Sequence, residues 1–207
     1  MADGEISRFG VLLIGTWEGN ENVGYADGGG VPTIGIGHTG PEVNVGDTIT
    51  DEQVLKYFRG DIGEAMGAIN SEVTVTLLPN QFDALVSFIF NVGVDAFTDS
   101  TLLKKLNTGA FESVPGQLSR WVNDNGQVVT GLINRRNAEI DLWQDSSKGH
   151  IVLMERAMES GKPAEAAKQA MLIDQTPGIL NLTVPSRTFA LTNAVCHCSS
   201  RGPRCAI

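Results

Sequence analysis

Two carboxylates and a hydroxyl lie close together in one glycine-rich segment near the start of the chain. Glu18 ends an apolar, helix-like run, Asp27 follows nine residues later, and Thr33 comes six residues after that and opens the apolar run TIGIG. Hydrolysis of a glycosidic bond needs an acid that protonates the leaving oxygen and a second group that stabilises the sugar cation or directs a water. An acid at a helix end, facing a carboxylate and a hydroxyl on a hairpin, supplies those groups.

The surroundings of the two acids favour different charge states. Glu18 lies beside Trp17 and after the apolar run 11–14, where desolvation favours the protonated acid. Asp27 precedes three glycines, where water and backbone N–H groups can stabilise the ionised form. Two carboxyl groups held in different states can divide the catalytic roles between them. The spacing alone is equally compatible with two solvated loop acids. Thr33 could also be an ordinary β-branched strand residue.

Three blocks of the sequence resemble the phage-type lysozymes, glycoside hydrolase family 24. The first block contains Glu18-Gly19, Tyr25-Ala26-Asp27 and GVPTIGIGH at 30–38, with the family's gaps between the polar residues. The second is QFDALVSFIFNVG at 81–93, followed by Phe97 and STLLKKLN at 100–107. The third contains Trp121 and GLINRRNAEIDLW at 131–143. The resemblance covers roughly residues 5–144, in the family's order and spacing.

The resemblance implies a role for each matching residue. Glu18 would be the general acid, and Asp27 and Thr33 would hold the attacking water or stabilise the developing charge. The family also has an arginine near the cleft that contacts the acid. Arg135 or Arg136 could fill that place, so both are expected to be substrate-binding residues. Phe97 matches an aromatic residue that lines the cleft and is expected to bind substrate as well.

His38 and the cysteines do not form a convincing metal site. His38 ends an apolar hairpin strand and has no HxxxH or HxH partner, so we expect it to be a structural histidine paired with a carboxylate. Cys196 and Cys198 have tighter spacing than usual zinc ligands, and although His197 is near them and Cys205, a well-placed fourth ligand is missing. We therefore expect neither a metal nor another cofactor.

The hydrophobic periodicity predicts a mostly helical protein with a small sheet. A first helix is expected over 5–17, and a hairpin region rich in turns over 23–38. Thr50 opens a capping-box pattern for a helix to about Ile69, and Pro79 starts an almost wholly apolar helix that Gly93 closes. Ser100 is expected to cap a helix to residue 107, NDNG at 123–126 to form a turn, and Thr130 to cap a last helix through Trp143.

These elements predict an α+β, lysozyme-like fold. A small N-terminal antiparallel sheet lobe and a helical C-terminal lobe, with a cleft between them, are expected within one catalytic domain over residues 1–145. Residues 146–175 are expected to form a helical C-terminal extension, and residues 176–207 a disordered tail.

The charge distribution limits the partners. The net charge is −9, divided into −12 over residues 1–145 and +3 over residues 146–207. An acidic body is unsuited to nucleic acid. No apolar run is long enough to span a membrane, and the N-terminus does not have the pattern of a secretory signal. We expect a monomer that binds peptidoglycan glycan chains.

The expected activity is that of a muramidase, which cleaves the β-1,4 bond between N-acetylmuramic acid and N-acetylglucosamine. Such an enzyme would be a phage endolysin, made in the host cytoplasm and reaching the periplasmic cell wall through a separate membrane lesion; a virion-carried enzyme would have the same sequence features. Two alternatives remain at this point. One is a lytic transglycosylase, and the other is a non-catalytic module that binds peptidoglycan.

Overall fold

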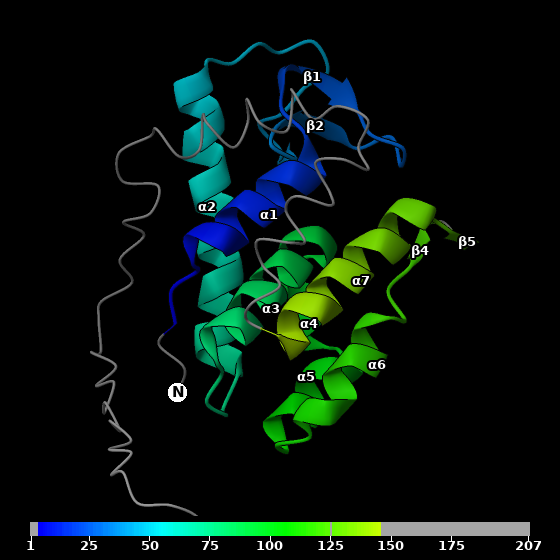
Figure 1. Cartoon of the computed structure of the whole chain (residues 1–207). Coiled ribbons are helices and arrows are strands. Elements are labelled where there is room, and N and C mark those ends of the chain that lie inside the picture. The colour runs from blue at the N-terminus through cyan, green and yellow to red at the C-terminus, as the bar shows by residue number, and fades with distance from the viewer. Residues whose placement is uncertain (1–3, 125, 146–207) are drawn as a thin grey trace, which may run out of the picture.

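The computed structural model describes residues 4–124 and 126–145 (Figure 1). The expected extension over 146–175 and the expected tail over 176–207 lie outside the described residues. The elements follow one another as α1 (Arg8–Glu18), β1 (Glu21–Ala26), β2 (Pro32–Gly35), β3 (His38–Thr39), α2 (Asp51–Glu72), α3 (Pro79–Val92), α4 (Val94–Thr98), α5 (Thr101–Asn107), a 3-10 turn η1 (Phe111–Ser113), α6 (Val114–Leu118), β4 (Asn123–Asp124), β5 (Gln127–Val128) and α7 (Thr130–Gln144).

Helix α1 carries the first candidate site residue at its last position. The side chain of Ser7 caps the helix by accepting a hydrogen bond from the N–H of Gly10, so α1 begins three residues later than the sequence pattern predicted. It ends at Glu18 because Gly19 turns the chain away at a φ of 74°, a conformation that favours glycine. The Glu18 carboxylate is therefore presented from a helix end, as expected.

The strands β1, β2 and β3 form an antiparallel sheet in sequence order. Tyr25 lies opposite Thr33 in the register of β1 and β2, and Ile34 lies opposite His38 in that of β2 and β3. The turn from β1 to β2 is closed by the N–H of Asp27, which donates to the carbonyl of Val31 at 3.0 Å. The predicted hairpin region is confirmed, and its turn contains the second candidate site residue.

Helix α2 links the sheet to the helical body of the molecule. It begins with the expected capping box, in which the Thr50 hydroxyl accepts from the N–H of Gln53 and the Gln53 side chain accepts from the N–H of Thr50. It continues to Glu72, three residues beyond the predicted end. Its contacts reach both β2 and β3 at one end of the molecule and α3 in the body (Figure 1).

Helix α3 is the buried centre of the helical body, as its apolar composition predicted. Pro79 occupies the first turn, where its missing N–H has no helical partner to lose, and the helix ends at Gly93. Nine of the ten residues from 80 to 89 are buried, and Leu85 and Phe88 among them are completely buried. The neighbours packed around α3 are α1, α2, α4 and α7.

The C-terminal helices follow the sequence pattern with one exception. Ser100 caps α5 by accepting from the N–H of Leu103, and the turn expected at 123–126 lies between the paired strands β4 and β5. The prediction that Thr130 caps the last helix is wrong. Val129 continues the extended backbone of β5 and is the residue before the helix, so Thr130 is already the first helical residue and its hydroxyl does not cap.

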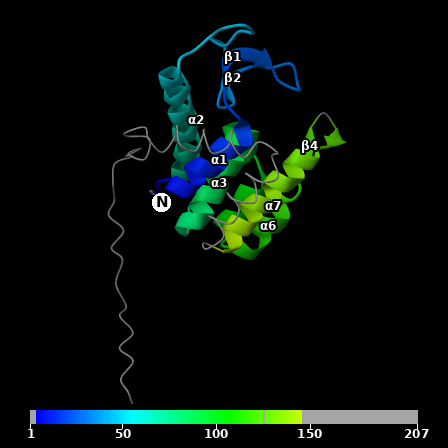
Figure 2. The same cartoon turned by 45° about the horizontal axis from the view of Figure 1, so that its top comes forward.

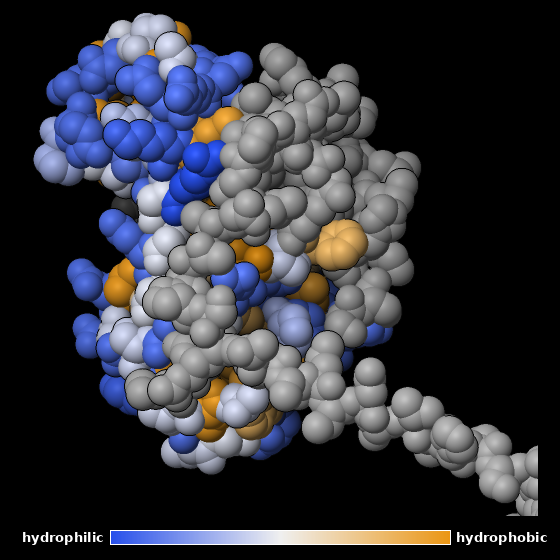
Figure 3. All heavy atoms as spheres, turned by 90° about the vertical axis from the view of Figure 1, so that its left-hand side faces the viewer, coloured by the Kyte–Doolittle hydropathy of each residue, from blue (hydrophilic) through white to orange (hydrophobic). Residues whose placement is uncertain are grey.

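The described part of the chain has the expected α+β arrangement, with the sheet at one end of a helical body (Figure 2). On the face shown in Figure 3, the described surface over the sheet-bearing end is mainly hydrophilic. Among residues 4–124 and 126–145, none of the helices combines the length and the apolar character needed to cross a bilayer.

Candidate active site

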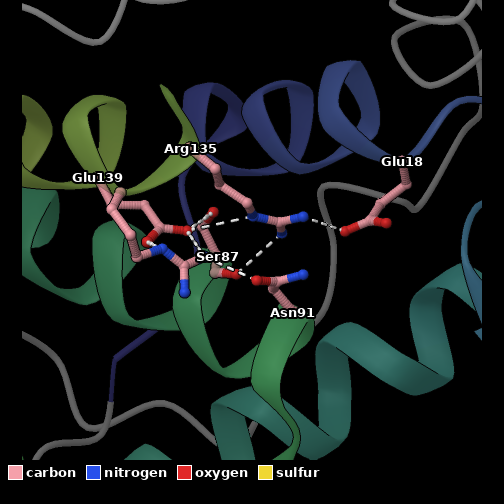
Figure 4. A network of polar contacts seen from close by, with 6 residues as sticks. Glu18, Ser87, Asn91, Arg135 and Glu139 are labelled. Carbon is pink, nitrogen blue, oxygen red and sulfur yellow. Dashed lines mark hydrogen bonds and ion pairs between the residues drawn. The ribbon is translucent and has the colours of Figure 1, made fainter. Parts of the chain in front are cut away.

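Glu18 lies where α1, α7 and the sheet meet. Its side chain is 18% exposed, and its Oε1 accepts a hydrogen bond from the Arg135 guanidinium of α7. Its Oε2 lies against Gly37, in the turn between β2 and β3. A Cβ atom built onto Gly37 would be only 3.0 Å from this oxygen. Gly37 has a φ of 70°, so both its conformation and its closeness to the carboxylate favour glycine. Figure 4 shows Arg135 extending from α7 toward Glu18 at the end of α1.

Asp27 and Thr33 are joined through the backbone of one hairpin residue, Val31. The Oδ1 of Asp27 accepts from the N–H groups of Gly29 and Val31, each at 2.8 Å. The Thr33 hydroxyl donates to the carbonyl of the same Val31 at 3.0 Å. Asp27 is exposed, whereas Thr33 is 4% exposed. The hairpin therefore fixes a solvent-facing carboxylate and a buried hydroxyl relative to each other.

Tyr25 lies close enough to Glu18 and Asp27 for their charges to act on it, and its place in the site was missed at the sequence level. Burial raises the pKa of the Tyr25 phenol, and the charges of Glu18, Glu21 and Asp27 raise it further. Both candidate carboxylates thus act on one phenol, which lies opposite Thr33 in the sheet. The signal was present in the sequence, because Tyr25 belongs to the Tyr25-Ala26-Asp27 block.

The structure chooses between the two arginines that the sequence left open. Arg135 is the arginine that contacts Glu18. Arg136 is 1% exposed and instead donates to Asn91 at 2.9 Å and to Glu139 at 3.1 Å. The expectation that Arg136 binds substrate gains no support from this, because its guanidinium is enclosed by protein, and it stays a prediction. Arg135 is also buried, at 4% exposure, and its guanidinium contacts the Glu18 carboxylate.

Phe97 does not line an open site either. Its side chain is completely buried and belongs to the hydrophobic core with residues of α2, α3 and α5. The burial gives no support to the expectation that Phe97 binds substrate, which stays a prediction: the apolar ring, on the short helix α4, fills the core of the helical body. Sequence spacing located the residue but could not give the direction of its side chain.

His38 has the structural role that its sequence context predicted, and the structure supplies its partners. Nδ1 lies 2.9 Å from Asp61 Oδ2 on α2, and Nε2 lies 3.0 Å from Glu42 Oε1. The ring also stacks on Tyr57, with 4.1 Å between centroids. Burial lowers the pKa of His38, but hydrogen bonds and charge from the two carboxylates outweigh it, and the net shift is upward. This cluster attaches β3 to α2.

A buried polar network lies behind Arg135, and its central residue was also missed. Glu139 is completely buried and accepts hydrogen bonds from Ser87, Arg135 and Arg136 (Figure 4). Its sequence signal was an acid placed three and four residues after the two arginines of one helix.

No group of three or more histidine, cysteine or acidic side chains suited to a metal ion occurs within residues 4–124 and 126–145.

Comparison with known proteins identifies the family. The Phage lysozyme family matches residues 15–139. An endolysin of Acyrthosiphon pisum secondary endosymbiont phage 1 is 40% identical over 145 residues, which cover 68% of this chain and 99% of the relative.

Two solved structures are similar as well. One is the endolysin from Escherichia coli O157:H7 phage FAHEc1, with a TM-score of 0.62, 35% identity, and coverage of 70% of this chain and 96% of that one. The other is the muramidase domain of SpmX from Asticaccaulis excentricus, with a TM-score of 0.62, 36% identity, and coverage of 69% and 99%.

The chain therefore belongs to the phage lysozyme family. It has the lysozyme-like α+β fold that the sequence predicted, and it is a glycoside hydrolase of the lysozyme type, a phage muramidase for host lysis.

Proposed function

We propose that Glu18, Asp27 and Thr33 together hydrolyse the β-1,4 bond between N-acetylmuramic acid and N-acetylglucosamine in peptidoglycan. The observation that carries this proposal is the position of Glu18 against Gly37, in the same small sheet whose hairpin joins Asp27 to Thr33 through Val31. A proton donor thus lies against a turn of the sheet that carries a carboxylate and a hydroxyl, the groups that glycosidic hydrolysis requires.

Each residue has a distinct part in the reaction. Glu18 donates its proton to the glycosidic oxygen as the bond to the sugar breaks. Asp27 stabilises the positive charge that develops on the sugar; its Oδ1 is held by two N–H groups, and Oδ2 accepts no hydrogen bond from any other described residue. Thr33 already donates its hydroxyl hydrogen to Val31, so its oxygen is available to accept a hydrogen bond from the attacking water. As the water oxygen bonds to the sugar carbon, the water loses a proton to the ionised Asp27 carboxylate.

The proposed substrate is the glycan chain of the bacterial wall, bound by a monomer. The net charge of −12 over residues 1–145 supports an interaction through specific contacts rather than attraction to an anionic polymer, and it disfavours nucleic acid. The endolysin relatives support an enzyme made in the host and released to the periplasmic wall through a separate membrane lesion, rather than a virion-carried one.

Product analysis on purified peptidoglycan tests the proposal. We expect new reducing ends at N-acetylmuramic acid with the parent enzyme and at least a hundredfold loss of rate with Glu18→Gln. Glu21→Gln is the matched control, because Glu21 is an exposed acid three residues away. Its rate should stay within twofold of the parent, and circular dichroism should show both variants folded.

Other products would replace the proposal with one of the two alternatives. Anhydro-sugar ends would identify a lytic transglycosylase. Binding without any new ends would identify a non-catalytic module. Near-normal cleavage by a folded Glu18→Gln variant would remove Glu18 from the mechanism.

A further inference from the structure

Glu139 is a carboxylate without solvent contact, and the proposed reaction does not use it directly. Its side chain is 0% exposed on α7, one helical turn after the two arginines. Its Oε1 accepts from Ser87 Oγ at 2.8 Å, from Arg136 at 3.1 Å and from Arg135 Nε at 3.3 Å. Its Oε2 forms an ion pair with Arg136 Nε at 2.8 Å. Burying a carboxylate this completely is costly unless charged partners surround it, as they do here.

The partners of Glu139 fix the orientation of Arg135. The Arg135 guanidinium is held through Nε by Glu139 and through one terminal nitrogen by the backbone carbonyl of Ser87 at 3.0 Å. The other terminal nitrogen points to Glu18. The guanidinium is rigid and planar. Holding two of its nitrogen atoms in place therefore determines where the third nitrogen meets the Glu18 carboxylate. Figure 4 shows Glu139 on the opposite side of this guanidinium from Glu18.

Glu139 also balances charge beside the acid. Two adjacent arginines are buried on α7, and the charge of Arg135 adds to the effect of burial in lowering the pKa of Arg136. Without Glu139, Glu18 would be the one carboxylate hydrogen-bonded to this pair within the described residues. A carboxylate in that position would be drawn into its ionised form, in which it cannot donate a proton.

We propose that Glu139 is a positioning residue for the hydrolytic reaction, which orients Arg135 toward Glu18 and supplies the negative charge that would otherwise have to come from Glu18 alone. This inference rests on the proposed role of Glu18 as the general acid. Within the described part of the chain, the charged and titratable groups around Glu18 include Arg135 and Arg136 from α7, with Glu139 behind them, and Tyr25 from β1.

Glu139→Gln tests the charge, because glutamine keeps the shape and a carbonyl oxygen. Initial rates on soluble, uncross-linked peptidoglycan strands should show kcat lowered about tenfold or more, with KM within twofold. The alkaline limb of the pH–rate profile, where the general acid loses its proton, should move down by about one pH unit. Glu112→Gln removes one exposed negative charge from η1 and should leave both readouts unchanged.

Arg136→Met tests the opposite sign. Removing one positive charge while keeping Glu139 should move the alkaline limb up by about one pH unit. A double variant with Glu139→Gln and Arg136→Met restores the charge balance and should return the limb to within about 0.3 pH units of the parent. A purely structural role for Glu139 would lower the folded fraction without moving the limb in opposite directions.

The inference is overturned if folded Glu139→Gln keeps the parental limb and a kcat within twofold of the parent. If that variant does not fold, an unmoved limb in Arg136→Met overturns it. If neither folds, Ser87→Ala decides, because it removes one hydrogen bond to Glu139 without changing charge. We expect a loss in kcat of about threefold at unchanged KM, and an unchanged kcat would contradict the inference.

The Glu18→Gln variant, measured alongside, distinguishes a failure of the proposed function from a failure of the proposed role of Glu139. An active Glu18→Gln enzyme removes the proposed function and this inference together. An inactive Glu18→Gln enzyme with a normal, folded Glu139→Gln enzyme removes this inference alone.

Discussion

The Arg135 guanidinium meets the Glu18 carboxylate across a sequence separation of 117 residues. This contact joins the last residue of α1 to α7, two helices that both pack on α3. Burial lowers the pKa of Arg135, but the charges of Glu18 and Glu139 outweigh it, and the guanidinium stays protonated. Glu18, the proposed acid, thus has the permanent cation Arg135 as its neighbour, and Glu139 and the Ser87 carbonyl hold that cation in place.

Arg135→Lys should impair both catalysis and stability. A lysine ammonium keeps the charge but cannot reach Glu18, Glu139 and the Ser87 carbonyl at once. We expect a rate loss of about tenfold to a hundredfold and a decrease in the free energy of unfolding of about 2 kcal/mol. Lysis assays and urea unfolding would measure the two effects. Arg120→Lys, at an exposed arginine, should change neither the rate nor the stability. Parental activity in Arg135→Lys would show that the three simultaneous contacts of the guanidinium are not needed.

Gly37→Ala should reduce activity more than its effect on stability explains. The added Cβ would lie 3.0 Å from Glu18 Oε2 and would displace the carboxylate. We expect at least a tenfold loss of rate and a loss of stability of about 1 kcal/mol from the positive φ. Gly46→Ala is the matched control, since Gly46 has a φ of 93° but no atom within 4 Å of the added Cβ. Equal loss of rate in the two variants would mean that backbone strain alone is responsible.

Asp83 should make the protein less stable as the pH rises from about 4 to 7. Burial raises the pKa of Asp83 from 3.8 to about 6, although hydrogen bonds from Ser7 oppose this. A raised folded-state pKa means that the stabilising contribution is complete below the unfolded value and is lost as the pH passes the folded value. The loss is about 3 kcal/mol.

Asp83→Asn should remove this part of the pH dependence, because asparagine is neutral and can keep both contacts with Ser7. Urea unfolding of parent and variant at pH 4, 5, 6 and 7 would measure the difference. Identical slopes of stability against pH in the two proteins would contradict the assignment.

The His38 cluster should contribute a second loss of stability at higher pH. Its folded pKa is raised, so the contribution is complete below the unfolded value of 6.5 and is lost as the pH rises through the folded value. We expect His38→Gln to be less stable than the parent at pH 6 by about 1 kcal/mol, with a smaller difference at pH 9. Thermal unfolding at both pH values would check this, and a constant difference would exclude a protonated His38 as its source.

Much of the site could be predicted from the sequence because its central residues are local. Glu18, Asp27 and Thr33 lie within one short block, where a helix end and a hairpin are the only elements needed. The helices followed from capping residues and apolar periodicity, as in the Thr50 capping box and the apolar α3. The pairing of His38 with a carboxylate was predicted too, but not that the carboxylate is Asp61 on a distant helix.

The parts of the site that the sequence did not predict depend on side-chain directions, which sequence spacing does not give. Arg135 and Arg136 are adjacent, and the packing of α7 on α3 determines which one faces Glu18. Phe97 was expected at an open surface, but the core of the helical body takes its ring. Glu139 was missed because an acid on a helix is usually solvated, and only the buried arginines beside it explain its place.

The two ends of α1 are both tethered to the helical body, at Ser7 through Asp83 and at Glu18 through Arg135. Asp27 and Thr33 instead belong to the hairpin, and the sheet contacts α2. The proton donor Glu18 is therefore held by the helical body, whereas Asp27 and Thr33, which would act on the sugar cation and the water, are held by the sheet. The way the sheet rests on α2 sets the gap between them, so a substitution at that junction can retune the stereochemistry of cleavage without touching any reacting group.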